Sequence, residues 1–314
     1  MSKIEKALNK AKATGGLRVV SPQDRTDPGQ QLSTVSAGLV SASEVELRAS
    51  RSELIARMRE IAPLDKGFMA KSRIIHPEMD ENGTVRAFRE IRTKVVQRSQ
   101  GRNCIIMVTS VTGEGGSSFV AMNLGAAFAF DAGKTALLMD CNFRNPSLHN
   151  LFTTHKNPFY GLTDYLENTN MDISEIIHPV GIERLRVIPS GGRREIPAEY
   201  FTSIKMKRLL DSIRERYHER YIILDAPPMT ESADTQILAE LCDYVLLVVP
   251  YGKATETQVT ASVKAISEKK LLGVVFNNEP QVPDLGWRDI FRNPFSFISQ
   301  AISHKNNYKT SRAK

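Results

Sequence analysis

Short, continuous hydrophobic runs alternate with amphipathic stretches between residues 84 and 280. The hydrophobic runs lack polar alternation, which is typical of strands buried on both faces of a parallel sheet. The stretches between them have helical spacing. The pattern predicts an α/β fold with a doubly wound, mainly parallel sheet flanked by helices. The expected strands are Cys104–Val108, Thr135–Asp140, Leu185–Pro189, Tyr221–Asp225, Tyr244–Pro250 and Leu272–Phe276, and the expected helices are Lys205–Tyr217, Asp234–Leu241 and Glu256–Lys269.

The pattern changes on both sides of this region. Residues 2–12 have the spacing of a short amphipathic helix. Residues 14–44 are rich in Gly, Ser, Thr, Pro and Gln, which predicts a disordered linker, and residues 44–59 again have helical spacing. We therefore divide the chain into a partly disordered N-terminal extension (1–83), an α/β domain (84–280) and a basic tail (281–314).

Composition narrows the class of protein only slightly. Of 314 residues, 41% are hydrophobic and 25% are charged, which is ordinary for a globular protein. No hydrophobic run approaches the roughly 20 residues that cross a bilayer, and the first residues do not resemble a signal peptide. The three cysteines lack metal-binding spacing, so we expect reduced thiols in a cytoplasm. The net charge of +7 would suit binding to nucleic acid, to an acidic membrane or to an acidic protein. By itself it does not distinguish between these three kinds of partner.

A glycine-rich turn joins the first predicted strand to a hydrophobic helix. This order places backbone N–H groups and a helix N-terminus around an anion, as in a phosphate-binding loop. Such loops carry a lysine directly before the first Ser or Thr of the helix, and here that position is Gly116. The residues expected to contact a nucleotide are Thr112, Gly113, Glu114, Gly115, Gly116, Ser117 and Ser118.

Two aspartates, Asp140 and Asp225, end hydrophobic strands. In an open parallel sheet, the carboxyl ends of the strands line the crevice where ligands bind. Two carboxylates there, with the hydroxyl of Ser117, would suit Mg²⁺ and a general base. Asp140 and Asp225 are therefore the candidate catalytic residues and, with Ser117, the candidate magnesium ligands. The alternative is that each aspartate only caps the turn that follows it.

With these motifs in order, residues 84–280 resemble the cytoplasmic kinase domain of bacterial tyrosine kinases of polysaccharide assembly, in the MinD/ParA-like P-loop group. The resemblance implies that Asn277, at the end of the last strand, faces the adenine base. The matching segments are Thr109–Ser118 with Asn123 and Leu124, Leu138–His149, Ile188–Gly192 with Pro197 and Glu199, Tyr221–Pro228, and Gly273–Asn277.

The chain departs from this family's pattern at several positions. Gly116 replaces the phosphate-loop lysine, which predicts a loss on the order of a hundredfold in phosphoryl-transfer rate. Asn142 replaces the second aspartate of its motif. The resemblance also implies a helix that drives the assembly of family members into rings. In this helix Arg89 and Arg92 are kept, but Arg86 replaces a glutamate. The C-terminal tyrosine cluster is reduced to Tyr308. Arg144 or Lys134 is a candidate replacement for the lysine, although Lys134 is more simply interpreted as a solvated residue after the helix-ending Gly133.

The resemblance implies a cytoplasmic regulator of exopolysaccharide or capsule biosynthesis and chain length that binds ATP or ADP with Mg²⁺ and has lost some or all kinase activity. Its implied partner is a membrane chain-length determinant, a polysaccharide co-polymerase, which would recruit it to the inner face of the membrane. A homo-oligomer is compatible with the sequence, and nucleic acid is not an expected partner. The tail is either a membrane-surface segment or a closing helix. The alternatives are an active tyrosine kinase of the same pathway and a ParA/MinD-like positioning ATPase.

Overall fold

The structure is a computed structural model that describes residues 18–20, 55, 58–79, 83–151 and 159–278. The predicted helix over residues 2–12, most of the predicted helix over residues 44–59 and the basic tail lie outside the described residues, as does Tyr308.

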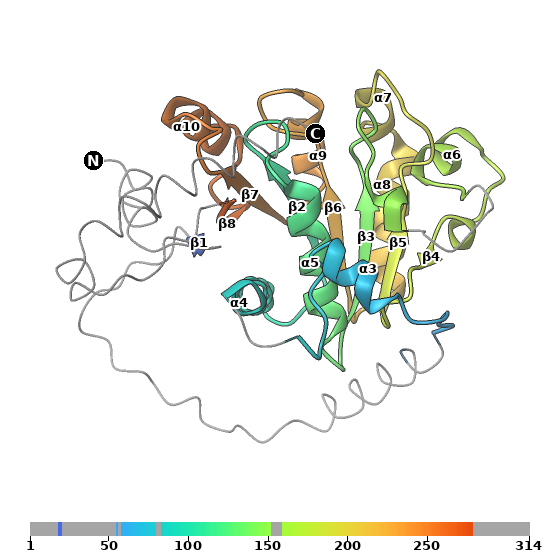
Figure 1. The fold of residues 1–314 in the computed structure, drawn as a ribbon. Helices are drawn as coiled ribbons and strands as arrows, with labels where there is room; N and C mark the ends of the chain where they lie inside the picture. The colour runs from blue at the N-terminus through green and yellow to red at the C-terminus, as the bar shows by residue number, and fades with distance from the viewer. Residues whose placement is uncertain (1–17, 21–54, 56–57, 80–82, 152–158, 279–314) are drawn as a thin grey trace, which may run out of the picture. The chain divides into compact units, whose positions relative to one another are not determined.

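Eight strands form one sheet: β1 (Arg18–Val20), β2 (Ile105–Ser110), β3 (Thr135–Asp140), β4 (His178–Pro179), β5 (Leu185–Ile188), β6 (Arg220–Asp225), β7 (Tyr244–Pro250) and β8 (Leu271–Asn277). Their order across the sheet is β1-β8-β7-β2-β6-β3-β5-β4 (Figure 1). The six inner strands are parallel, and β1 and β4 are antiparallel to their neighbours. The chain crosses from β2 to β3 over the position that β6 later fills, so the loops after these three strands adjoin.

Helices cover both faces of the sheet, as a doubly wound fold requires. Side chains alternate between the faces along each strand, so that Ile106 and Val108 point to one core while Ile105 and Met107 point to the other. This confirms the predicted fold class. The helices of the first face are α3 (Lys66–Lys71), α4 (Gly83–Arg98) and α5 (Ser117–Ala129). Those of the second are α6 (Leu162–Glu167), α7 (Ala198–Phe201), α8 (Ile204–Arg216), α9 (Asp234–Glu240) and α10 (Glu256–Ala265). Two short 3₁₀ helices are η1 (Leu148–Leu151) and η2 (Ile173–Glu175).

Residues 58–79 pack on the α/β domain, although the sequence places the start of that domain at residue 84. Ile74 and Ile75 are buried in the core of the first face. The backbone N–H of Ile75 donates to Oδ1 of Asn123 on α5 at 2.8 Å, which satisfies a fully buried amide. The Glu60 carboxylate pairs with the buried guanidinium of Arg186 at 3.0 Å. The packed region therefore begins before residue 84, while the division at residue 280 stays a prediction.

The expected linker contains one strand. Residues 18–20 form β1, whose backbone pairs antiparallel with β8 from Arg18 opposite Phe276 to Val20 opposite Val274. The prediction of disorder is therefore wrong for these three residues. A strand of three residues is too short to show an alternating pattern. The Gly-, Ser- and Pro-rich composition of the segment around it indicates a linker instead.

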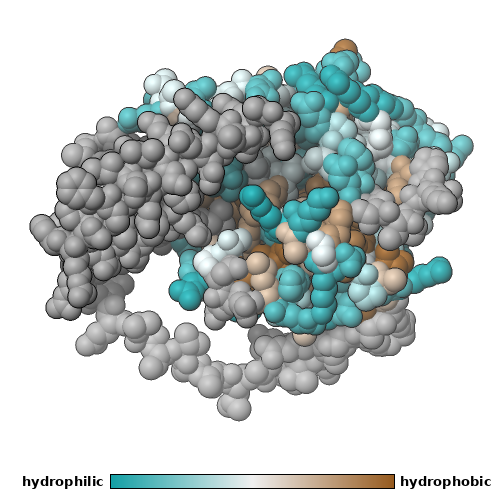
Figure 2. Space-filling model, in the orientation of Figure 1, coloured by the Kyte–Doolittle hydropathy of each residue, from teal (hydrophilic) through white to brown (hydrophobic). Residues whose placement is uncertain are grey.

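No helix in the described part of the chain combines the length and hydrophobicity that crossing a bilayer needs. On the face shown in Figure 2, most of the described residues at the surface are hydrophilic. Hydrophobic residues are visible among them near α3 and α5.

Candidate functional site

The ends of β3 and β6 bring the two predicted aspartates together. Asp140 and Asp225 are partners in the parallel register of these strands, and Asp225 is also in register with Val108 of β2. Both side chains are fully buried. The loop that leads from β2 to α5 starts at Val111, three residues after Val108, so it begins near this pair of carboxylates.

Close neighbours surround the three glycines of the phosphate loop. A Cβ on Gly115 would lie 2.5 Å from Cβ of Ser110. A Cβ on Gly113 would lie 2.3 Å from Oε1 of Glu231, which follows β6. Gly116 precedes α5 with φ +87°, in the left-handed region, and a Cβ there would lie 2.1 Å from Nδ2 of Asn277. A lysine at residue 116 would therefore be strained by this φ, and its Cβ would require the Asn277 amide to move.

The Asp225 carboxylate has unusual surroundings. Neither of its oxygens accepts a hydrogen bond from any residue that the structure describes. Burial, and then the charge of Asp140, raise its pKa well above the ordinary range. The hydroxyls of Ser118 and Ser117 offset part of this rise without completing a hydrogen bond to either oxygen. Two buried acceptor oxygens without donors are what a bound cation would satisfy.

Asp140 is held by the loop that follows it. Its carboxylate accepts backbone N–H bonds from Asn142 at 3.1 Å, Ser147 at 2.9 Å and Leu148 at 3.0 Å. Burial raises its pKa, and these hydrogen bonds lower it in part. The side chain of Asn142 accepts from the backbone N–H of Asn145 at 3.2 Å, so it supports a turn. Asp140 thus caps the turn that follows it, which is the alternative interpretation of this residue. It also lies beside Asp225.

Other predicted nucleotide contacts surround the loop. Ser117, the first residue of α5, is buried, and Ser118 and Thr112 are partly buried. The Thr112 hydroxyl is buried and has no hydrogen-bond partner in the described part of the chain. Nδ2 of Asn277 donates to the carbonyl oxygen of Gly115 at 3.0 Å. Asn277 therefore lies against the loop, and its contact with adenine stays a prediction.

Both predicted replacements for the lysine pair with carboxylates outside the loop. Arg144 pairs with Asp234 at the start of α9, with Nη2 and Oδ2 3.3 Å apart. Lys134 pairs with Asp131 at 2.8 Å, beyond the C-terminal end of α5. Since α5 has 13 residues, Lys134 lies about 20 Å from the loop. The prediction for Lys134 is therefore wrong.

The structure reveals a lysine that the sequence did not single out. Nζ of Lys253 lies 3.0 Å from Oε2 of Glu114 in the phosphate loop. Lys253 follows the carboxyl end of β7, the neighbour of β2. The rule that strand ends line the ligand crevice could have identified it.

The arginines of the predicted assembly helix lie on α4. Arg86 and Arg89 are exposed. Arg92 is partly buried, and its Nη1 donates to the carbonyl oxygen of Ala127 in the last turn of α5 at 3.0 Å. Arg92 thus already has a role within the chain, and its part in assembly stays a prediction.

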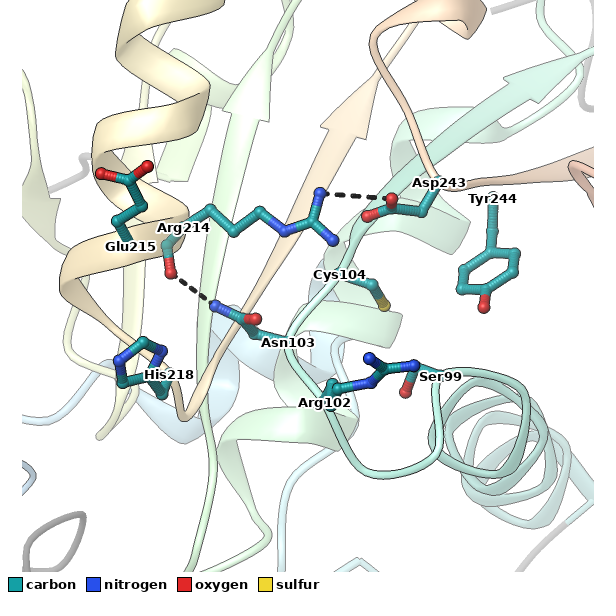
Figure 3. Close-up of a pocket in the computed structure, with 9 residues that line it drawn as sticks. All are labelled: Ser99, Arg102, Asn103, Cys104, Arg214, Glu215, His218, Asp243 and Tyr244. Atoms are coloured by element: carbon teal, nitrogen blue, oxygen red, sulfur yellow. Dashed lines mark hydrogen bonds and ion pairs between the residues drawn. The ribbon is translucent and has the colours of Figure 1, made fainter. Parts of the chain in front are cut away.

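A pocket of about 540 Å³ opens at the opposite, amino-terminal edge of the strands (Figure 3). Asn103 donates to the carbonyl oxygens of Arg214 and Tyr217, which end α8, and Arg214 pairs with Asp243 at 3.3 Å. Burial raises the pKa of the Cys104 thiol to about 12, so it stays protonated at neutral pH. These contacts join α8 to the sheet and give the pocket a structural explanation.

Among the described residues, no group of three or more His, Cys, Asp or Glu side chains is placed to hold a metal ion. The Asp140–Asp225 pair would therefore need the Ser117 hydroxyl and ligand oxygens to complete a magnesium site.

Two relatives of this chain carry the name tyrosine-protein kinase. Tyrosine-protein kinase CpsD of Streptococcus agalactiae is 31% identical over 192 residues, which cover 60% of this chain and 80% of CpsD. A relative named EpsB from Ralstonia solanacearum is 31% identical over 201 residues, 63% of this chain but only 26% of EpsB, so the chain spans about a quarter of that protein. The crystal structure of the chimerical protein CapA2B2 superposes with a TM-score of 0.60 at 26% identity, covering 74% of this chain and all of that one. No protein-family model matches the chain.

Proposed function

The chain belongs to the bacterial tyrosine-protein kinases, and from that premise we propose that it binds an adenine nucleotide with Mg²⁺ at the phosphate loop. In this proposal the bound nucleotide regulates exopolysaccharide or capsule biosynthesis and chain length, and tyrosine phosphorylation is strongly reduced or lost.

The observation that carries the proposal is the Asp225 carboxylate. It is fully buried, lies beside a second carboxylate and accepts no hydrogen bond of normal geometry among the described residues, although the hydroxyls of Ser118 and Ser117 lower its pKa in part. Such an arrangement is costly in a folded protein unless a ligand compensates for it. A magnesium ion held by Asp140, Asp225 and Ser117 would compensate for it, since these are oxygen ligands of the kind that Mg²⁺ prefers.

Magnesium would neutralise charge on the β- and γ-phosphate oxygens of the nucleotide. The chain itself contributes the backbone N–H groups of the loop and of the start of α5, which bind phosphate without a lysine. Asp140 is oriented by three backbone N–H groups and so presents a fixed carboxylate. Asn142 carries no charge and its side chain supports a turn, which leaves one carboxylate fewer than the family motif provides.

An active tyrosine kinase is the second candidate. The specific observation in its favour is that Asp140, Asp225 and Ser117 are all present and adjoin the loop. Phosphotyrosine on the purified wild-type protein that is absent from Asp140→Ala would establish this reading.

The partner and the location follow from family membership and are proposals. We expect the protein to be cytoplasmic and to be recruited to the inner face of the membrane by a chain-length determinant protein, whose cytoplasmic tail would dock on the nucleotide-bound domain.

Calorimetric titration of Mg-ATP and Mg-ADP into the wild-type protein and Asp225→Ala tests the proposed function. We expect micromolar binding by the wild type and its loss in the variant. Binding weaker than about millimolar by the wild type for both nucleotides would contradict the proposal.

A further inference from the structure

The phosphate loop has a cation in contact with it, and that cation comes from a distant part of the chain. Nζ of Lys253 and Oε2 of Glu114 are 3.0 Å apart, although the two residues are separated by 139 positions. Lys253 belongs to the segment of residues 251–255 that connects β7 to α10. This segment follows the carboxyl end of a strand next to β2, the same edge of the sheet at which the loop begins.

Asn277 holds this connecting segment and the phosphate loop side by side. The backbone N–H of Tyr251 donates to the carbonyl oxygen of Asn277 at 2.8 Å. Nδ2 of the same asparagine donates to the carbonyl oxygen of Gly115 at 3.0 Å. Thr255 then caps α10, since its hydroxyl accepts from the backbone N–H of Gln258. Lys253 is therefore anchored on both sides, by Asn277 and by the start of a helix.

The negative charge around the phosphate loop favours a cation in contact with it. Carboxylates of Glu114, Glu231 and Asp225 lie in or beside the loop. A nucleotide would add further negative charge from its phosphates. Gly116 cannot supply a cation. Arg144 pairs with the largely buried Asp234, whereas the carboxylate partner of Lys253 is almost fully exposed.

We infer that Lys253 supplies the positive charge that Gly116 lacks, by binding the phosphates of a nucleoside di- or triphosphate. Glu114 holds Lys253 at the loop when no nucleotide is bound. The ion pair is half-exposed at the lysine and almost fully exposed at the glutamate, so it is weak and readily exchanged. Phosphate is the stronger partner for an ammonium group because it carries more charge and more acceptor oxygens. This inference rests on the proposed function, since it requires a nucleotide at the loop.

The test measures the dissociation constants of Mg-ATP and Mg-ADP by calorimetry at fixed, low ionic strength. We expect Lys253→Met to weaken Mg-ATP binding about tenfold or more, and Mg-ADP binding less, because ADP lacks the γ-phosphate. Glu114→Gln should strengthen binding several-fold, because it removes the competing partner of Lys253. In the double variant, Glu114→Gln should strengthen binding less than it does alone, since only the repulsion between Glu114 and the phosphates remains to be relieved.

Lys270→Met is the matched control. Lys270 also pairs with a glutamate, Glu240, at 3.0 Å, but it precedes β8 at the opposite edge of the sheet. We expect this variant to bind both nucleotides as the wild type does. Lys270 also donates to the carbonyl oxygens of Ala239 and Glu240 at the end of α9, so Lys270→Met should be the less stable of the two variants. A cooperative thermal transition without nucleotide shows that each variant is folded.

The outcomes separate this inference from the proposed function. Unchanged Mg-ATP affinity in Lys253→Met, or equal losses in Lys253→Met and Lys270→Met, would overturn the role of Lys253. If Asp225→Ala abolishes binding in the same series, the proposed function still stands. A wild-type protein that binds neither nucleotide would overturn both.

Discussion

At the scale of single residues, the Asp225 side chain opposes folding while it provides the best ligand for a cation. A buried carboxylate loses its hydration, and no described residue donates a hydrogen bond of normal geometry to this one in exchange. The folded state therefore holds the proton more tightly than the unfolded state does. Between the unfolded pKa of about 4 and the raised folded pKa, the stability of the metal-free protein falls as the pH rises.

We predict that Asp225→Asn stabilises the metal-free protein at neutral pH by about 1–3 kcal/mol. For a domain of this size, each kcal/mol raises the melting temperature by about 2–4 °C. The gain should shrink as the pH approaches 4, where the carboxyl is protonated in the unfolded state as well as in the folded state. Thermal unfolding in a chelator at several pH values measures this. A variant that is less stable than the wild type at pH 7 would contradict the account of Asp225 as an uncompensated charge.

Gly116 offers a second prediction at this scale. Gly116→Ala should destabilise the protein through both its left-handed φ and contact with Asn277, by about 1–3 kcal/mol in total. Gly252 has φ +69° but open space around its Cβ position, so Gly252→Ala measures the backbone effect alone. Chemical denaturation of both variants gives the difference. Equal losses of stability in Gly116→Ala and Gly252→Ala would show that Asn277 moves aside without cost. In that case only backbone strain from the positive φ would oppose a lysine at residue 116.

At the scale of elements, residues 58–79 act as part of the domain. We predict that a chain starting at residue 58 unfolds at nearly the melting temperature of the full chain. A chain starting at residue 80 should lose several kcal/mol, because Met69, Ile74 and Ile75 are removed from the core at about 1.5–3 kcal/mol each. Both chains lack β1, so the comparison isolates this segment. Equal stability of the two chains would show that the segment packs without stabilising the sheet.

The sequence predicts the long, buried elements well. Thr135–Asp140 and Tyr244–Pro250 are observed with the predicted bounds, because an uninterrupted hydrophobic run can be satisfied only inside a sheet. The helices α3, α6 and α7 have four to six residues, too few turns to show helical spacing, and no pattern identified them. The placement of Asp140 beside Asp225 was predictable because strand ends share an edge. The pairing of Lys253 with Glu114 depends on tertiary structure alone.

At the scale of the whole molecule, α4 presents Arg86 and Arg89 on one exposed side. Copies of the chain that met through this helix would bring like charges together, which opposes association. We predict that the described domain is monomeric at micromolar concentration and that Arg86→Glu increases self-association, since it supplies the acidic residue of the family's assembly helix. Sedimentation velocity at low salt measures both. Arg98→Glu, at the other end of α4, is the control, and an equal response in the two variants would argue against a specific interface.

The hydrogen bond from Asn277 to Gly115 has a consequence for the order in which the site is completed during synthesis. The two residues are 162 positions apart. At about 5–20 residues per second, a ribosome adds Asn277 roughly 8–30 s after Gly115. The phosphate loop emerges early, but the contact that closes it against β8 cannot form until almost the entire domain has been made. A nascent chain therefore meets cellular nucleotides first with an unlocked loop, and the finished geometry is the last part of the site to appear.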